Sequence, residues 1–408
     1  MIGAGAAGTM AAIFAAGEDA DVLLLERTDD GGRKILISGG GRCNILPVRE
    51  APARFVTASP PRLLPRLLRS WPLREQVAFF RDEAGIPLAE EAESGKLFPT
   101  SNRARDVRDA LFALARRRGV SIRTSALVTG LSPLDADGHA RWRIAVDGSP
   151  HAEADAVVVA TGGLSIPRSG SDGTGLAFLE RLGHAVSPTY PALTPLIGPA
   201  PPAPASVFAG LAGVSLPVAL TARSEGARAA AEGGFLFTHR GYSGPAVLDV
   251  SHVAVQSSAA RLAVRWSSRD AASWESALQP DGSRTVAGVL RGELPHRLAD
   301  ALCALARVDP ARSLSQLRRE ERLRLVETLQ GTELPWSGHE GYGKAEVTGG
   351  GIRLDDVDPK TLESRRHPNL HLCGELLDAF GPIGGHNFQW AWATGRAAGL
   401  AAARRARP

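Results

Sequence analysis

The sequence feature that most constrains the fold is a glycine pattern close to the N-terminus, Gly3-x-Gly5-x-x-Gly8. A helix-like apolar run follows it, and then a strand-like run that ends in Glu26. In a βαβ dinucleotide-binding unit, the first glycine permits a tight turn, the second lets the backbone approach a pyrophosphate, and the third lets the helix pack close to the sheet. The helix amides face the phosphates, and an acid about 20 residues further on contacts ribose hydroxyls. The pattern therefore predicts a dinucleotide site.

One part of this unit is short in the sequence. A dinucleotide-binding unit opens with a buried strand of about five residues, but only Met1 and Ile2 precede Gly3. We therefore expect that most of the central first strand lies upstream of Met1. An upstream in-frame segment rich in Val and Ile would support this expectation, and a stop codon directly before Met1 would contradict it.

The composition is that of an ordinary globular protein. The 408 residues are enough for two or three domains, and 44% hydrophobic with 22% charged residues exclude a disordered or collagen-like chain. The three cysteines, Cys43, Cys303 and Cys373, lie far apart and form no CxxC motif. This spacing argues against a disulfide framework and a zinc site, so we expect a reducing, cytoplasmic location and no metal.

Charge and hydropathy argue against two classes of partner. The chain has 47 Lys and Arg against 43 Asp and Glu, and the two kinds are interspersed except at 116–118 and in the C-terminal tail. A nucleic-acid-binding protein would cluster its positive charge. No apolar stretch reaches the ~18 residues of a membrane span. We therefore expect a small-molecule substrate, and neither a nucleic acid nor a membrane as partner.

Beyond the first unit, the chain alternates between helical and strand-like patterns. Residues 60–118 are expected to be mainly helical, and 120–124 to form a strand. Residues 156–160 are apolar throughout and lead into Thr161 and Gly162, as in a buried parallel strand.

The pattern changes near residue 191, where prolines gather. From there the chain is strand-like over 206–268 and helical over 285–330, and α/β character returns over 345–408. One leucine stripe in the helical stretch is expected in the core: Leu294, Leu298, Leu302 and Leu305.

The most unusual stretch is GRKILISGGGRCN at 32–44. Three consecutive glycines expose backbone amides and permit close approach to a flat or anionic ligand. Lys34 and Arg42 add positive charge, which beside a flavin would favour the electron-rich reduced ring. Cys43 is expected to be a small packed thiol rather than a redox group. A flexible loop is the alternative interpretation.

A second candidate segment lies near the C-terminus. Residues 371–378 are typical of a short strand that delivers an acid, Glu375, to a turn, and residues 384–389 open a final helix expected at 390–403. Helix N-terminal amides suit the flavin N1–C2=O region, where negative charge builds on reduction. Glu375 is placed to hydrogen-bond a ribityl chain. The alternative is an ordinary capped helix.

Together these motifs resemble one family, the bacterial BaiN/RdsA-like NAD(P)/FAD-dependent oxidoreductases, also called aminoacetone-oxidase-family FAD-binding flavoproteins. The resemblance covers nearly the whole chain, and its glycine-rich loop and C-terminal motif are the specific parts. The matching segments are GAGAAG at 3–8, GRKILISGGGRCN at 32–44, GKLFP at 95–99, ATGGLSIP at 160–167, GSDGTG at 170–175, GFLFTHRGYSGPAVLDVS at 234–251, VTGGGIRL at 347–354, TLESR at 361–365 and CGELLDAFGPIGGHNFQWAWATGRAAG at 373–399.

The resemblance implies an α/β fold with non-covalently bound FAD in a discontinuous domain of the two-dinucleotide-binding, Rossmann-like type. This domain would comprise 1–190 and 345–408. The insert, 191–344, would hold a β-barrel-like part at 191–270 and a helical part at 285–335.

The candidate cofactor-binding residues follow from the motifs and from the resemblance. They are Gly3, Gly5, Ala7, Gly8, Glu26, Arg27, Lys34, Ser38, Gly40, Gly41, Arg42, Cys43, Asn44, Val128, Ala160, Thr161, Gly162, Gly374, Glu375, Asp378, Gly384, Gly385, His386, Asn387 and Gln389.

Some positions depart from the family pattern. Ile45-Leu46-Pro47 replaces the usual x-Thr-Asn, a Tyr is usual where Ile166 and His386 stand, and a Met is usual where Leu362 stands. His386 is a candidate proton donor or base, since imidazole titrates near neutrality, or else a helix-start residue in contact with solvent. His239, on the insert, is a second acid/base candidate, although a structural turn explains its surroundings equally well.

These features predict an FAD-dependent oxidoreductase that passes a hydride between a small organic substrate and flavin N5. As a reductase it would take electrons from NAD(P)H, bound transiently because no second GxGxxG unit is present. As an amine oxidase of the aminoacetone type it would release hydrogen peroxide. A flavin-binding redox sensor or scaffold without turnover is a further alternative. An FAD-dependent RNA-modifying enzyme is a weaker one, by analogy of fold alone.

Overall fold

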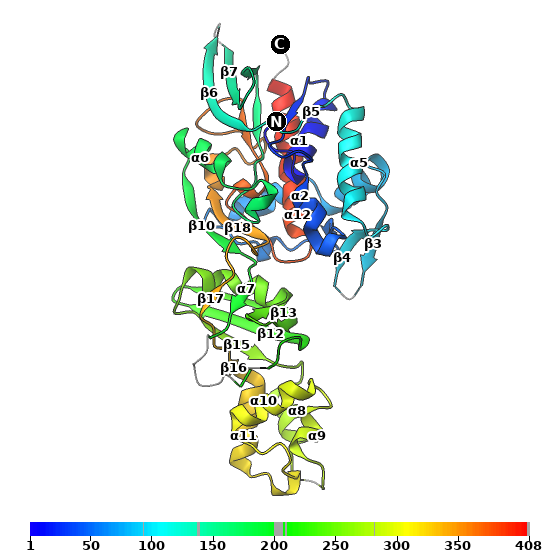
Figure 1. Ribbon diagram of the computed structural model, residues 1–408, viewed down its shortest axis with the longest axis vertical. Helices are drawn as coiled ribbons and strands as arrows, with labels where there is room; N and C mark the ends of the chain where they lie inside the picture. The colour runs from blue at the N-terminus through cyan, green and yellow to red at the C-terminus, as the bar shows by residue number, and fades with distance from the viewer. Residues whose placement is uncertain (93, 137–138, 200–206, 209, 281, 406–408) are drawn as a thin grey trace. The chain divides into compact units, whose positions relative to one another are not determined.

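The computed structural model describes residues 1–408 except 93, 137–138, 200–206, 209, 281 and 406–408. The described chain divides into two compact units (Figure 1). The first combines Met1–Tyr190 with Glu346–Pro408, and the second is Pro191–Ala345. The chain therefore leaves the first unit once, forms the second, and returns.

A parallel sheet lies at the centre of the first unit. β1 (Leu23–Leu25) pairs with β5 (Ser121–Arg123), and β9 (Val157–Val159) pairs with β19 (Leu370–Leu372). In each pair the first residues of the two strands lie opposite each other. β9 and β19 are buried at every position, as is usual for parallel strands covered on both faces.

The start of the chain lies between these two pairs of strands. Ile2 forms parallel bridges with both Leu25 and Val159. The amides of Ile2 and Gly3 donate to the carbonyls of Val158 and Leu25 at 2.9 and 2.8 Å. The sheet therefore has the order β5, β1, start of the chain, β9, β19.

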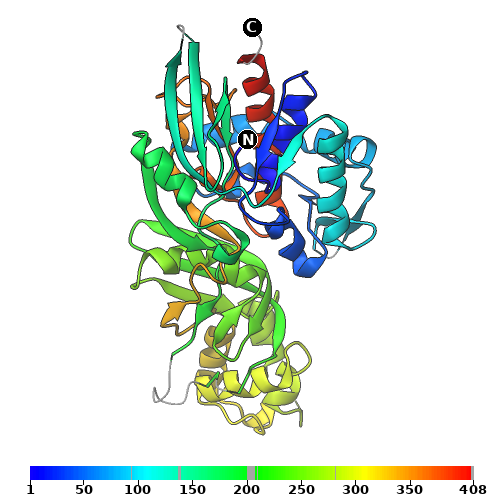
Figure 2. The same cartoon turned by 45° about the horizontal axis from the view of Figure 1, so that its top comes forward.

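Helices that pack closely together flank this sheet. α1 (Ala6–Ala16) lies beside α12 (His386–Arg405), and α5 (Ala104–Arg117) packs against α1 as well (Figures 1 and 2). A Cβ atom on Gly395 or Gly399 of α12 would come within 2.3 or 2.2 Å of a carbonyl oxygen of α1. Glycine at these two positions is what allows the first and last helices to touch.

A three-stranded antiparallel sheet completes the core of the first unit. β7 (His139–Val146) pairs with β6 (Val128–Ala136) and β8 (Ala152–Ala154). The buried Trp142 side chain of β7 shares a core with β9 and β19, and its Nε1 donates to the Pro368 carbonyl at 3.2 Å.

The remaining elements of the first unit are short. One small antiparallel sheet has the order β2 (Leu46–Pro47), β4 (Lys96–Pro99), β3 (Leu88–Glu91). β10 (Val186–Ala192) pairs with β18 (Val347–Ile352). The short helices are α2 (Arg33–Ile37), α3 (Leu64–Leu68), α4 (Leu73–Ala78), which continues into a π-helical turn at Phe79–Glu83, and α6 (Thr174–Arg181).

The second unit is built on one antiparallel sheet with a helical part. Its centre is the long hairpin of β12 (Ser215–Ser224) and β13 (Ala227–Phe237), against which α7 (Pro245–Gln256) packs. The sheet has the order β16, β15, β12, β13, β14, β11, β17. Its other strands are β11 (Leu196–Ile197), β14 (Gly241–Ser243), β15 (Arg261–Arg265), β16 (Thr332–Glu333) and β17 (Gly338–His339), and the helices of the helical part are α8 (Ala271–Ala277), α9 (Val286–Leu290), α10 (His296–Ala306) and α11 (Arg319–Gly331).

The α/β fold is confirmed, and so are the strands expected at 120–124 and 156–160. The stretch 60–118 is mainly helical, as expected, and also contains the β3–β4 hairpin. Two local expectations were wrong: the strand-like stretch 206–268 contains α7, and the final helix begins at His386 rather than Trp390. The leucine stripe is also incomplete: Leu305 is 41% exposed, whereas its three partners are at most 3% exposed.

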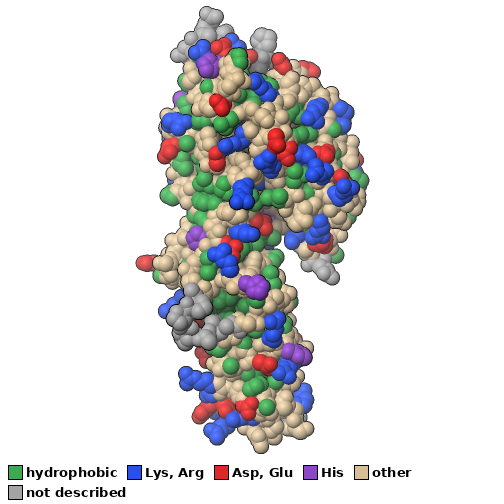
Figure 3. All heavy atoms as spheres, in the orientation of Figure 1, with side chains coloured by type: hydrophobic (Ala, Val, Ile, Leu, Met, Phe, Trp, Pro, Cys, Tyr) green, Lys and Arg blue, Asp and Glu red, His purple; other side chains and the backbone are tan. Residues whose placement is uncertain are grey.

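On the face drawn in Figure 3, basic and acidic side chains are interspersed. Within the described residues, no helix has both the length and the apolar character that crossing a membrane requires.

Candidate active site

The first unit contains a cavity of about 600 Å³. It lies where the turn before α1, the end of β1, the segment 32–44, the segment after β9 and the start of α12 meet. The expected cofactor-binding residues that line it are Gly3, Gly5, Ala7, Glu26, Arg27, Lys34, Ser38, Gly40, Arg42, Asn44, Val128, Ala160, Thr161, Gly162, Gly374, Glu375, Gly384, Gly385 and Asn387. Those that do not are Gly8, Gly41, Cys43, Asp378, His386 and Gln389.

The three glycines of the first motif serve different purposes. Gly3 has a φ of 99°, and a Cβ there would lie 2.6 Å from the Ala160 carbonyl oxygen. A Cβ on Gly8 would lie 1.9 Å from the Gly3 carbonyl oxygen, so this glycine is needed for packing. A Cβ on Gly5 would meet no protein atom within 4 Å, although Gly5 lines the cavity. The space beside Gly5 is therefore left for a ligand.

The N-terminus of α1 is open at this cavity. Its N-cap residue is Gly5, no side chain caps the helix, and its first turn carries no acidic residue. Free amides at a helix N-terminus attract anions such as phosphates.

Glu26 lies at the end of β1 and is almost fully buried. Its Oε1 accepts hydrogen bonds from the Thr28 amide at 2.8 Å and the Thr28 hydroxyl at 2.7 Å, and its Oε2 accepts one from the Ala4 amide at 2.8 Å. A carboxylate oxygen accepts about two hydrogen bonds, so Oε2, with one donor, retains an acceptor position, and Glu26 lines the cavity. Next to it, Arg27 forms an ion pair with Asp172.

The glycine-rich loop has a left-handed backbone. Gly39, Gly40 and Gly41 have φ of 55°, 67° and 85°, and Cys43 also has a positive φ of 60°. A Cβ on Gly40 would meet nothing within 4 Å. Burial raises the pKa of the Cys43 thiol to about 12, although a hydrogen bond with Ser38 opposes the shift. The thiol is therefore protonated and packed at neutral pH.

Asn44 joins this loop to the start of α12. With its amide nitrogen turned toward the Leu46 carbonyl, it donates there at 3.1 Å and accepts from the Gly385 amide at 2.9 Å. Gly385 has a φ of 89°, and a Cβ there would lie 2.5 Å from the Leu46 carbonyl carbon. Asn387 exchanges two hydrogen bonds with the Gly381 backbone, at 2.8 and 2.9 Å. The loop and the helix start thus hold each other in place.

Glu375 is held by the polypeptide rather than free in the cavity. Lys34 Nζ lies 2.6 Å from Glu375 Oε2 and donates to Ser165 Oγ at 2.7 Å. The Ser165 hydroxyl donates to Glu375 Oε1 at 2.6 Å, and the amide and hydroxyl of Thr348 donate to the same oxygen at 3.0 Å. Four segments far apart in sequence therefore meet at one carboxylate.

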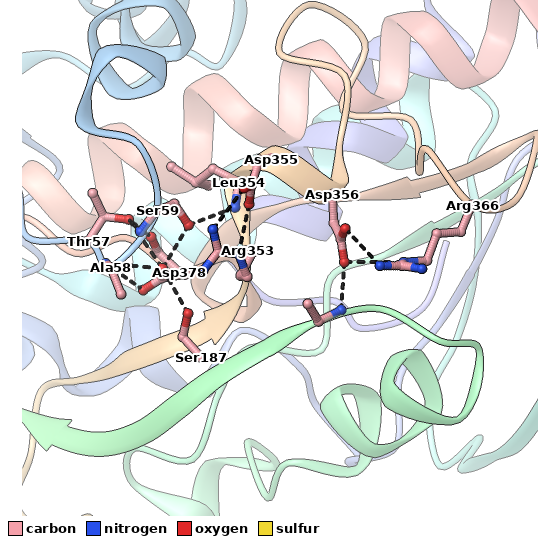
Figure 4. A network of polar contacts seen from close by, with 11 residues as sticks. Thr57, Ala58, Ser59, Ser187, Arg353, Leu354, Asp355, Asp356, Arg366 and Asp378 are labelled. Carbon is pink, nitrogen blue, oxygen red and sulfur yellow. Dashed lines mark hydrogen bonds and ion pairs between the residues drawn. The ribbon is translucent and has the colours of Figure 1, made fainter.

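Asp378 lies in a separate network, shown in Figure 4, and is 1% exposed. Its Oδ2 accepts from the Ser59 hydroxyl at 2.8 Å, the Ser187 hydroxyl at 3.1 Å and the Ala58 amide at 3.1 Å. Ser59 in turn accepts from the Leu354 amide at 2.9 Å. Asp378 thus ties the segment at 57–59 to β10 and to the end of β18.

His386 is the first residue of α12 and is buried, with its ring edge-on to Phe55. Burial, with a smaller contribution from the Arg54 cation, lowers the pKa of the imidazole to about 4, although the side chain of Gln389 opposes this shift. The ring is therefore neutral at pH 7. It does not have the solvent contact considered as one alternative for this residue.

His239 belongs to the second unit, in the exposed turn between β13 and β14. Several residues at or near the cavity had no role assigned from the sequence, and four of them are notable. Ser165 and Thr348 hold Glu375, while Lys96 and Phe98 of β4 line the cavity. All four lie in the motif segments given above, so the signal was present without a chemical assignment.

These features fit a dinucleotide such as FAD. The open helix N-terminus suits its pyrophosphate, Glu26 Oε2 suits a ribose hydroxyl, and Gly5 and Gly40 leave room beside the backbone. The cavity volume lies within the ~300–1,000 Å³ of cofactor sites.

Two curated proteins are similar to this chain over almost its whole length. A 3-dehydro-bile acid delta(4,6)-reductase of Clostridium scindens is 34% identical, over 99% of this chain and 98% of its own length. A ribosomal RNA dihydrouridine synthase of Escherichia coli is 32% identical, over 97% of this chain and 95% of its own length.

Solved structures show the same fold at lower identity. A 3-ketosteroid-delta4-(5alpha)-dehydrogenase of Rhodococcus jostii RHA1 superposes with a TM-score of 0.52 at 17% identity, covering 98% of this chain and 95% of the other. Sdh1 of Mycobacterium smegmatis gives 0.51 at 19%, covering 100% and 68%. The family model of the HI0933-like protein Rossmann domain matches residues 1–401. The chain is therefore an FAD-dependent oxidoreductase that belongs to the HI0933-like Rossmann-domain family.

Proposed function

We propose that the protein is a reductase that delivers a hydride to an activated carbon–carbon double bond of a small organic substrate, with electrons taken from NAD(P)H. The observation that carries the proposal is the meeting of the glycine turn, Glu26 and the start of α12 at one cavity. The names of the curated relatives support the direction, since one is a reductase and the other forms dihydrouridine, which is uridine with its ring double bond reduced.

When bound, FAD supplies two-electron chemistry, and the chain supplies binding and orientation. In this proposal, the amides of α1 hold the pyrophosphate and Glu26 holds a ribose. The start of α12, fixed to the loop by Asn44, presents its positive end where negative charge develops on reduction. Phe388 and Trp390, which line the cavity, exclude water from it.

Absorbance spectroscopy tests this proposal. We expect purified protein to be yellow, to bleach anaerobically with NADH or NADPH, and to regain its colour when an α,β-unsaturated ketone is added. Peroxide release on adding aminoacetone in air would instead support the amine oxidase. Failure to bleach with any donor would favour a redox sensor or scaffold without turnover.

A second candidate substrate is uridine in ribosomal RNA. The Escherichia coli relative and a Haemophilus influenzae relative, 31% identical over 99% of this chain, are both named ribosomal RNA dihydrouridine synthases. The expectation of no nucleic-acid partner therefore stays a prediction. The interspersed charges in Figure 3 favour the small substrate.

Adding protein-free ribosomal RNA to the NAD(P)H-reduced protein distinguishes between the two candidate substrates. Return of the yellow colour, together with dihydrouridine detected by mass spectrometry of the digested RNA, would support the RNA substrate. Colour return with the unsaturated ketone alone would support the small one.

A further inference from the structure

The wall of the cavity carries several charged side chains, and some of them are paired near solvent. The ion pairs Arg27–Asp172 and Arg42–Glu91 have side chains 35–45% exposed. The side chains of Lys34 and Glu375 are only 24% and 18% exposed. Because solvent screens charges less in a buried setting, each charge of this pair, taken alone, would act on a bound group more strongly than the charges of the other two pairs.

The geometry makes the pair electrically balanced. Lys34 Nζ and Glu375 Oε2 lie 2.6 Å apart, so the ammonium and the carboxylate largely cancel each other at a distance. Ser165 bridges them by accepting from Lys34 Nζ and donating to Glu375 Oε1. Thr348 adds two further donors to that oxygen. Removing either charge leaves the other one uncompensated and firmly positioned at the cavity.

We propose that Lys34 and Glu375 form a compensated charge couple, in which each charge offsets the effect of the other on the reduction potential of the bound flavin. Uptake of two electrons and one proton gives the oxidised flavin one additional negative charge. An unopposed carboxylate at the cavity disfavours that charge, and an unopposed ammonium favours it. The inference rests on the proposed function, because it requires FAD in this cavity.

Lys34 and Glu375 are positioning residues in this inference, and their test is the midpoint potential. FAD-loaded wild type, Lys34→Met, Glu375→Gln and the double variant are each reduced anaerobically with xanthine and xanthine oxidase beside a reference dye. We expect Lys34→Met to shift the potential to more negative values and Glu375→Gln to more positive values. Each shift should correspond to about a tenfold change in the equilibrium constant for reduction.

The double variant should return close to the wild-type potential, and Lys34→Arg should stay near it because the positive charge is kept. Arg141→Met is the matched control: it removes the cation of the Arg141–Asp155 pair, whose residues do not line the cavity, and should leave the potential unchanged. If Lys34→Met does not retain FAD, Lys34→Gln takes its place.

Single variants that both shift in the same direction, or a double variant as displaced as either single one, would show a merely structural role and overturn the inference. Identical potentials in all FAD-loaded variants would also overturn it while leaving the proposed function intact. Wild-type protein that cannot be loaded with FAD would overturn both.

Discussion

At the scale of single residues, burial decides the chemical state of the side chains around the cavity. Cys43 lies in a left-handed backbone position with a pKa raised to about 12, so it is a packed thiol and no nucleophile at neutral pH. His386 is held neutral by the same desolvation. An imidazole of such low basicity is a weak general base, and at pH 7 it carries no proton to donate from a charged form.

The lowered pKa of His386 predicts a pH-dependent stability. Its value falls from 6.5 to about 4 on folding, so between these values the unfolded chain binds a proton that the native protein does not. The contribution of His386 to the free energy of unfolding must therefore fall as the pH is lowered through this window, by about 2 kcal/mol between pH 7 and pH 5. Urea unfolding at the two pH values measures this loss.

The matched variant is His386→Gln, which keeps a polar side chain but cannot titrate. Burial also lowers the pKa values of His184 and His252, and their contribution is common to both proteins. The loss between pH 7 and pH 5 should thus be about 2 kcal/mol smaller in the variant. Equal losses would show that His386 is protonated in the native state.

Residue types and spacing were enough to propose the acid at Glu26 and the glycines around it. Most partners of Glu375 and Asp378 were not predictable, because residues such as Ser165 and Ser187 come from segments more than 100 residues away. Sequence spacing places a carboxylate on a turn, but only tertiary packing decides which donors surround it.

At the scale of elements, the glycines of the turn before α1 serve two purposes: one is needed for packing, and another leaves room in the cavity. A Cβ on Gly8 collides with the turn itself, whereas a Cβ on Gly5 fills only the cavity. The backbone at Gly5, with a φ of −79°, also accepts alanine without strain.

This difference predicts that Gly5→Ala folds normally and binds FAD poorly. The thermal midpoint of the FAD-free variant should match that of the wild type, while its dissociation constant for FAD, measured by fluorescence titration, should rise by at least about tenfold, since a methyl group replaces the closest backbone approach.

Gly8→Ala provides the comparison. It should lower the midpoint of the FAD-free protein, because the new Cβ lies 1.9 Å from the Gly3 carbonyl oxygen. Full FAD affinity in Gly5→Ala would mean that the ligand does not occupy the space beside this residue.

Two elements, α7 and the β3–β4 hairpin, were not predicted from the sequence patterns, and each has a physical reason. α7 lies in a stretch of sequence that otherwise forms strands. Its apolar side chains pack against β12 and β13, so the spacing of apolar residues in α7 reflects its contacts with that sheet. The β3–β4 hairpin is short, and only two of its strand residues, Phe98 and Pro99, are buried, so too few buried positions show an alternation. Long helices and fully buried strands, such as α5 and β9, carried the clear signals.

At the scale of the whole molecule, each unit has a hydrophobic core of its own. The core built around Trp266 and Trp274 draws only on residues 196–334, and the two other cores draw only on the first unit. The cavity is lined by the first unit alone. A ligand of this cavity should therefore stabilise one unit and leave the other unchanged.

Scanning calorimetry tests this expectation. We predict two unfolding transitions, of which FAD raises only one, by about 2.7 kcal/mol at a free concentration 100 times its dissociation constant. Limited proteolysis at each transition identifies the unit that unfolds. One cooperative transition that moves as a whole would contradict independent units.

The contact between α1 and α12 has a consequence for biosynthesis. α12 follows α1 by several hundred residues along the chain, so the cavity lacks the part of its wall that α12 forms until that helix has been synthesised. At roughly 5–20 residues per second, the interval between the two helices is on the order of tens of seconds. Cofactor capture therefore follows the synthesis of α12, and a chain truncated before α12 should lack the yellow colour of bound flavin.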